Sequence, residues 1–229
     1  MAIQWHNLPR DDSKLGAERA VFVGAVGSGK TYGALRVCGA LYGTRQILIM
    51  DTKADPNIAK LDGPVVKTAS GLGRYRDAVK FPLIIYRPVV QELEPAFLDQ
   101  VCQWIYDRQD TILLIDEVTQ VTGGKTQPGL GLLNAITRGR SRHVSVFSCS
   151  QRPVMVPPIV FTESEWLYAF YLRRKTDIAT VDDYTEDGFV ERVISARKQG
   201  VDHAVGVYAM ASGGRIYPSI QAALSGREL

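Results

Sequence analysis

The chain contains one loop motif that few folds can accommodate. It fits the pattern GxxxxGK[ST] and consists of Gly24, Ala25, Val26, Gly27, Ser28, Gly29, Lys30 and Thr31. An apolar run, Arg19–Val23, precedes it, and a stretch with helical spacing, 30–42, follows it. Glycines let such a loop turn its backbone N–H groups inward, where they bind phosphates together with the N-terminus of the helix. We therefore expect a nucleotide site in which Lys30 reaches the β- and γ-phosphates and Thr31 holds Mg²⁺.

Other short apolar runs alternate with helical patterns along the chain. Strands are expected at Gln46–Met50, Leu83–Tyr86, Thr111–Ile115, 144–149 and 166–172, and helices at 93–108, 132–142 and 185–198. Short helices are expected within 54–80, a glycine-rich loop at 121–131, and a β-hairpin at 204–219. The helix at 93–108 should bury Phe97, Val101, Trp104 and Ile105. This pattern predicts a three-layer α/β fold with a mostly parallel central sheet and a C-terminal hairpin, in a single domain at 19–229 behind an N-terminal arm at 1–18.

Two carboxylates follow the strand expected at Thr111–Ile115. A strand buried on both faces would bring Asp116 to the sheet edge beside the phosphate loop, where it can bind Mg²⁺, usually through a water molecule. Glu117 can then polarise the attacking water as general base. Kinases of small molecules and GTPases usually lack a glutamate directly after the magnesium aspartate, so the pair favours ATP hydrolysis. An acidic strand end in solvent is the alternative.

The strand expected at 144–149 is followed closely by Gln151. If this strand lies beside the strand of Asp116, Gln151 can contact both the γ-phosphate and the attacking water; otherwise it is an ordinary polar strand end. Two strands, Gln46–Met50 and Leu83–Tyr86, stand between the loop strand and the Asp116 strand in the sequence. This is expected of an ATPase with an added strand between its two motif strands.

Basic side chains gather just before the Gln151 strand. Arg138, Arg140 and Arg142 could supply an arginine finger to a neighbouring subunit, contact DNA phosphates, or form a solvated helix face. Lys125, in the glycine-rich loop, is a candidate for contacting DNA in a central pore. The run Arg173-Arg174-Lys175 is interpreted as surface charge.

Composition adds few constraints. With 27 basic and 24 acidic residues the net charge is +3, which does not require a nucleic-acid partner. The three cysteines are far apart and form no CxxC pair, so we expect buried free thiols. The first residues lack the pattern of a secretory signal, and no apolar stretch approaches the roughly 20 residues that span a bilayer.

Four blocks of the sequence together resemble the FtsK–HerA superfamily of DNA-pumping ATPases. They are 24–31, Met50-Asp51-Thr52-Lys53, Leu114-Ile115-Asp116-Glu117, and 139–144 leading to Ser150-Gln151-Arg152-Pro153. In this superfamily a strand that closes in Gln, often Gln-Arg-Pro, follows an arginine at the spacing of Arg140, which stands eleven residues before Gln151. The resemblance covers roughly 19–172. It implies a RecA-like P-loop ATPase fold in which Arg140 is the finger acting in a neighbouring subunit and Gln151 is the sensor.

Within this superfamily the short chain, and its segment Val156-Pro157-Pro158-Ile159 followed by Glu163-Ser164-Glu165, resemble the genome-packaging ATPases of tailless viruses with internal membranes. The resemblance implies ATP and Mg²⁺ as ligands, a hexameric ring that threads double-stranded DNA, capsid-vertex or membrane proteins as further partners, and a location in the virion or the host cytoplasm. Two other functions stay open at this point. One is an ATPase that assembles or extrudes filamentous phage, which usually carries a membrane segment. The other is a non-motor scaffold or partition protein that switches its assembly state on ATP.

Overall fold

A single mixed sheet organises the part of the chain that the computed structural model describes, residues 18–124 and 127–228. The strand order is β3-β4-β2-β5-β6-β1-β7-β8-β9. Pairing is parallel from β3 to β7 and antiparallel for β7–β8 and β8–β9. The strands are β1 (Arg19–Val23), β2 (Gln46–Met50), β3 (Val65–Val66), β4 (Leu83–Tyr86), β5 (Thr111–Ile115), β6 (Ser145–Ser150), β7 (Trp166–Ala169), β8 (Val205–Ala209) and β9 (Gly213–Tyr217).

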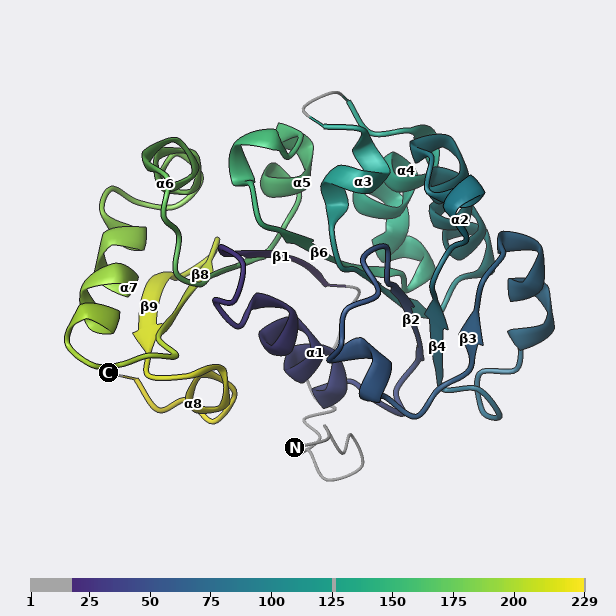
Figure 1. Ribbon diagram of the computed structural model, residues 1–229, viewed down its shortest axis with the longest axis horizontal. Coiled ribbons are helices and arrows are strands. Elements are labelled where there is room, and N and C mark those ends of the chain that lie inside the picture. Colours follow the sequence, from purple (N-terminus) through teal and green to yellow (C-terminus); the bar gives the residue numbers. More distant parts are fainter. Residues whose placement is uncertain (1–17, 125–126, 229) are drawn as a thin grey trace.

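Helices cover both faces of this sheet and give three layers (Figure 1). The α-helices are α1 (Lys30–Ala40), α2 (Pro95–Arg108), α3 (Val118–Thr122), α4 (Leu130–Arg138), α5 (Pro158–Thr162), α6 (Lys175–Asp182), α7 (Phe189–Lys198) and α8 (Ile220–Leu224). Short 3₁₀ helices are η2 (Ile58–Lys60), η3 (Ala69–Tyr75), η4 (Val90–Glu92), η5 (Gly139–Arg142) and η6 (Pro153–Met155). The α/β class, the mostly parallel sheet and the C-terminal hairpin are all confirmed.

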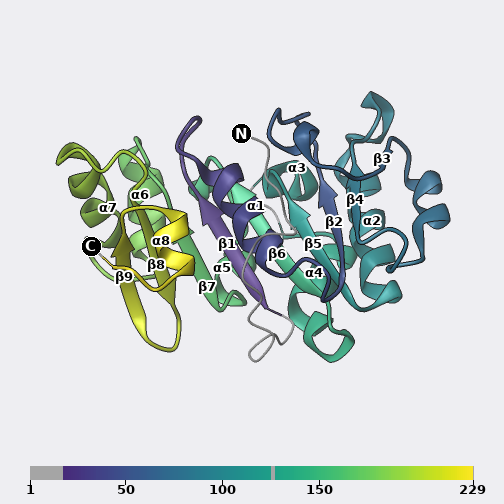
Figure 2. The ribbon, with the colours of Figure 1, turned by 90° about the horizontal axis from the view of Figure 1, so that it is seen from below.

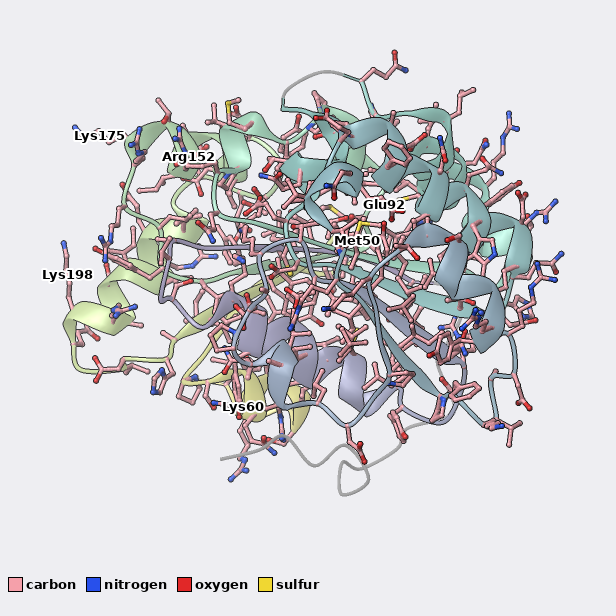
Figure 3. All side chains as sticks on the ribbon, turned by 45° about the vertical axis from the view of Figure 1, so that its right-hand side comes forward. Met50, Lys60, Glu92, Arg152, Lys175 and Lys198 are labelled. Atoms are coloured by element: carbon pink, nitrogen blue, oxygen red, sulfur yellow. The ribbon has the colours of Figure 1, made fainter. Side chains whose placement is uncertain are left out.

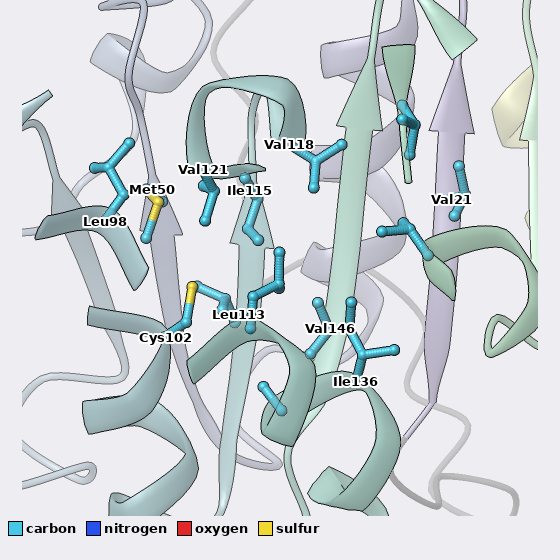
Figure 4. Packing of buried hydrophobic residues seen from close by; sticks show 14 of the residues in the cluster. Val21, Met50, Leu98, Cys102, Leu113, Ile115, Val118, Val121, Ile136 and Val146 are labelled. Carbon is cyan, nitrogen blue, oxygen red and sulfur yellow. The ribbon is translucent and has the colours of Figure 1, made fainter. Parts of the chain in front are cut away.

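The apolar strands divide their side chains between two cores, because successive residues of a strand point to opposite faces. Val21 of β1 packs in the cluster that includes α2, α3 and α4, whereas Phe22 packs in the cluster that includes α1 and α8. Figure 4 shows the first cluster, in which Leu98 and Cys102 of α2 lie against the sheet. The three cysteines are buried and free, as expected.

The buried stripe of α2 differs from the predicted one. Leu98, Val101, Cys102 and Ile105 are buried, whereas Phe97 is 41% exposed. The buried positions follow the helical spacing 98, 101, 102 and 105, so Phe97 lies beside the stripe that meets the sheet. Trp104, also expected on the buried face, is only partly buried. Helix α2 also caps the start of the neighbouring helix α4, a contact that residue spacing does not predict. Asp99 Oδ2 and Oδ1 accept hydrogen bonds from the N–H groups of Gly131 and Leu132 at 3.0 and 2.8 Å.

Other boundaries also shift. The strand expected at 166–172 ends at Ala169, and the helix expected at 185–198 begins at Phe189 and is preceded by α6, which was not predicted. Helix α3 occupies the start of the expected loop at 121–131, while α4 begins at Leu130. Lys125 and residues 1–17 of the expected arm lie outside the described residues. Within the described ranges, no helix combines the length and the apolar character needed to cross a membrane.

The strand order corrects the expected position of the added strand. β2 and β4, which separate the two motif strands in the sequence, lie beyond β5 in space. The strand between β1 and β5 is β6, which pairs in parallel with both. Because these strands run in parallel, the segments that follow β1, β2, β5 and β6 all start at one edge of the sheet, here called the carboxyl edge (Figure 2).

Candidate nucleotide site

The glycine-rich loop connects β1 to α1 at the carboxyl edge. Gly27 and Gly29 adopt φ values of 74° and 92°, which side chains rarely tolerate. A Cβ atom at Gly24 would lie 2.4 Å from Ser28 Oγ, so only glycine fits there. The loop is fixed at its start, because Gly24 N donates to Ser150 O at 3.2 Å and Ala25 N donates to Tyr171 O at 2.9 Å.

The acidic pair lies beside this loop and is almost fully buried, with Asp116 2% and Glu117 5% exposed. Thr31 Oγ1 donates to Asp116 Oδ1 at 3.3 Å, while Asp116 Oδ2 is buried and has no hydrogen-bond partner among the described residues. Burial raises the pKa of Asp116, and the nearby charges of Lys30 and Lys53 partly oppose that shift. A buried carboxylate oxygen without a partner is costly, and a divalent cation bound by Asp116 and Thr31 would satisfy it. The residues present therefore fit Mg²⁺.

Glu117 accepts three contacts within its pocket. Lys53 Nζ lies 2.5 Å from Glu117 Oε2, Thr119 Oγ1 donates to Oε1 at 3.0 Å, and Gln151 N donates to Oε2 at 3.3 Å. Lys53 follows β2 and keeps 32% of its side chain exposed. The sequence pattern did not identify Lys53 as a partner of Glu117. The polar run Asp51-Thr52-Lys53 directly after a buried strand was the available signal.

A cavity of about 200 Å³ lies against the phosphate loop. It is lined by Ala25 to Tyr32, Asp55, Asn57 and Gln151. Gln151 therefore lies beside the phosphate loop, because β6 stands between the two motif strands. Asp55 and Asn57 were not predicted. A second cavity of about 500 Å³ shares Ser28, Gly29 and Tyr32 with the first and extends to Phe170, His203, Ser219, Ile220 and Gln221.

The three candidate finger arginines lie far from this cavity. They stand at the end of α4 and in η5, directly before β6, and therefore at the amino edge of the sheet, opposite the phosphate loop. Arg142 packs its guanidinium 4.4 Å from the centre of the Tyr106 ring. The side chain of Arg140 is 71% exposed and lies 3.8 Å from Glu165. Arg140 consequently cannot reach the loop of its own chain.

Comparisons with known proteins agree with this fold. The genome-packaging NTPase B204 from Sulfolobus turreted icosahedral virus 2 in complex with ATP-γS superimposes with a TM-score of 0.72 and 18% identity, covering 90% of this chain and 100% of that chain. B204, the DNA-packaging ATPase from Sulfolobus turreted icosahedral virus, gives 0.70 and 17%, covering 88% and 97%. The pCW3 conjugation coupling protein TcpA with ATP-γS gives 0.55 and 11%, covering 89% of this chain and 60% of that one.

No protein-family model and no curated protein matches the sequence. At these identities the superpositions establish the fold. The RecA-like P-loop architecture implied by the sequence resemblance is thus confirmed.

Proposed function

We propose that this protein is an ATP-hydrolysing motor that translocates double-stranded DNA and packages a viral genome into a preformed capsid. The observation that carries the proposal is the meeting of three strand ends at the carboxyl edge. The phosphate loop after β1 and Gln151 after β6 line one cavity. Asp116, after β5, accepts a hydrogen bond from Thr31 of the loop, and Glu117 accepts one from Gln151 N. The shared fold with the B204 packaging NTPases, which bind ATP analogues, supports the same class of activity.

The residues that meet at the carboxyl edge have distinct chemical roles in this proposal. The N–H groups of residues 24–31 and the ammonium group of Lys30 bind the β- and γ-phosphates. Thr31 and Asp116 hold Mg²⁺, which supplies positive charge to the phosphate oxygens when it is bound. The adjoining cavity at Tyr32 and His203 offers room for the nucleoside part of ATP.

Hydrolysis itself needs a base and an orienting group. Glu117 takes the proton of the attacking water, and its burial beside Thr119 and the Gln151 backbone fixes the direction of its carboxylate. The side chain of Gln151 orients the water and senses the γ-phosphate. Arg140, at the opposite edge of the sheet, completes the site of a neighbouring subunit in a hexameric ring by stabilising charge on the transferred phosphoryl group. Phosphate contacts then move the duplex without reading its sequence.

The ATPase rate with and without long duplex DNA tests this function. We expect duplex DNA to stimulate the wild-type rate, because a motor couples turnover to its track. The Glu117→Gln variant should still bind ATP but lose at least about a hundredfold in rate, since general-base catalysis contributes roughly 10²–10⁴. Lys30→Ala should lose ATP binding.

Two results would contradict the proposal. Normal hydrolysis by Glu117→Gln would show that the base is a different residue. A wild-type rate that DNA leaves unchanged, together with assembly driven by ATP, would favour a nucleotide-dependent scaffold instead of a pump.

A further inference from the structure

Five cations gather at the carboxyl edge of the sheet beyond β7. Arg173, Arg174 and Lys175 lie where the chain passes from β7 into α6, and Arg197 and Lys198 end α7. These five residues are called the basic edge. Figure 3 shows Lys175 and Lys198 projecting from the same side of the molecule. The sequence pattern indicates only surface charge at Arg173-Arg174-Lys175. It does not predict the cluster, because the two groups of cations are separated by more than twenty residues.

The charge of the basic edge is not neutralised. Arg173, Arg174, Lys175 and Lys198 are exposed, and none of the five cations pairs with a carboxylate in the described part of the chain. Arg197 packs its guanidinium 4.6 Å from the centre of the Tyr171 ring.

The carboxylate in the first turn of α6 is already engaged. Asp177 is 2% exposed and accepts hydrogen bonds from Arg152 Nε at 3.0 Å and from Val154 N at 3.2 Å. It is therefore not available to the cations that begin the helix.

The cations Arg174 and Lys175 also disfavour the helix that begins beside them. Helix α6 starts at Lys175, with Arg174 as its N-cap residue and no side-chain hydrogen bond to its free N–H groups. Positive charge at this end of a helix is unfavourable, because the helix dipole is positive there. Local choices that disfavour the fold are expected at functional sites. An anion bound at the basic edge would remove the conflict.

We propose that the basic edge binds the phosphate backbone of duplex DNA. This inference rests on the proposed motor function and names the surface through which the motor holds its track. Phosphate contacts from arginine and lysine supply affinity that is independent of base sequence, which a packaging motor requires.

The basic edge is joined to the nucleotide site through two contacts. The carbonyl of Tyr171, two residues before Arg173, accepts the hydrogen bond from Ala25 N at the start of the phosphate loop. Arg152, directly after Gln151, pairs with Asp177 of α6. These two contacts connect the segment 171–177 both to the phosphate loop and to the strand end that carries Gln151.

The test measures binding of a random-sequence duplex in the absence of nucleotide. The triple variant Arg173→Gln, Arg174→Gln, Lys175→Gln is compared with a control triple, Lys67→Gln, Arg74→Gln, Lys80→Gln, which removes three exposed cations on the other side of the molecule. We expect the first variant to bind roughly tenfold or more weakly, with the slope of log affinity against log salt reduced by about 2 to 3. The control should bind like the wild type.

Thermal unfolding separates binding from folding. Because the substitutions remove cations from a helix N-terminus, the melting temperature of the first variant should equal or exceed that of the wild type. A clearly lower melting temperature would overturn the proposal, since the cations would then be structural. Unchanged DNA affinity would also overturn it. Retained DNA affinity with lost affinity for an ATP analogue would do so as well, by assigning these cations to a nucleotide.

The same measurement distinguishes this inference from the proposed function. If the wild type binds duplex DNA and the triple variant binds equally well, only the location of the surface is wrong. If the wild type does not bind duplex DNA, the motor function fails with it.

Discussion

At the scale of single residues, the environment of Glu117 is the feature with the clearest chemical consequence. Both of its oxygens accept contacts, and the shortest of these comes from Lys53. Lys53 lies in the segment after β2, at the same carboxyl edge as Glu117, and its long side chain remains partly exposed. In the proposed mechanism, Lys53 is therefore a positioning residue that holds the Glu117 carboxylate in the direction needed for proton transfer.

We predict that Lys53→Met lowers kcat by roughly tenfold while leaving the KM for ATP nearly unchanged, because orientation of the general base is lost but phosphate binding is not. Lys53→Arg should recover part of the rate, since it restores the positive charge. Steady-state kinetics of both variants make the measurement. A rise in kcat for Lys53→Met would instead show that the ion pair restrains Glu117.

Sequence patterns identified the residues of this site whose signals are local. The loop at 24–31 and the pair Asp116–Glu117 are contiguous motifs next to apolar strands, so their positions at the sheet edge follow from strand direction alone. The partnership of Lys53 with Glu117 joins positions 64 residues apart on different strands. It depends on β2 lying next to β5, which no spacing in the sequence encodes.

At the scale of elements, one clamp joins the amino ends of β1 and β7. Arg19 N donates to Glu165 Oε2 at 2.7 Å, and the Arg19 guanidinium binds both oxygens of the same carboxylate. Burial would raise the pKa of Glu165, but the hydrogen bonds and charge of Arg19 outweigh burial, so its pKa lies below the ordinary value of 4.5. The stabilisation by a carboxylate with a lowered pKa is complete above pH 4.5 and is lost as the pH falls through the folded pKa.

We predict that Glu165→Gln lowers stability at pH 7 and makes stability less sensitive to acid below pH 4.5. Urea unfolding at pH 7 and at a lower pH, for wild type and variant, makes the measurement. Glu163→Gln is the matched control, because Glu163 lies 3.6 Å from the same arginine but is more exposed. If wild type and Glu165→Gln lose the same stability between the two pH values, the clamp does not control the acid response.

The predicted strands are confirmed where the sequence contains a nearly continuous apolar run. β1, β2, β4 and β5 lie where the pattern placed them, because fully buried parallel strands consist of contiguous apolar residues. The short helices expected within 54–80 are present as η2 and η3, but the short α-helices elsewhere were not predicted. α3 and α5 have five residues each, too few to show a helical period, and α6 begins with three polar residues, Lys175, Thr176 and Asp177.

At the scale of the whole molecule, the order of the strands could not be predicted from sequence, because it is decided by which strands pair. The placement of β6 between β1 and β5 brings Gln151 to the phosphate loop at one edge and leaves Arg138, Arg140 and Arg142 at the other. If Arg140 is the finger, as proposed, the chain cannot complete its own site, because Arg140 and the phosphate loop lie at opposite edges. The proposal therefore requires that activity depend on how neighbouring subunits are arranged.

Mixing two inactive variants tests this dependence. In the proposed mechanism Lys30→Ala removes phosphate binding and Arg140→Ala removes the proposed finger, so each variant should be inactive as a pure ring. In a mixed ring, an Arg140→Ala subunit keeps an intact phosphate loop and receives Arg140 from a Lys30→Ala neighbour, so we expect the mixture to recover a measurable ATPase rate. Arg142→Ala serves as the control, because Arg142 packs on Tyr106. Its pure ring should keep most of the wild-type rate. No recovery in the mixture, with both proteins folded and assembled, would place the finger at another residue.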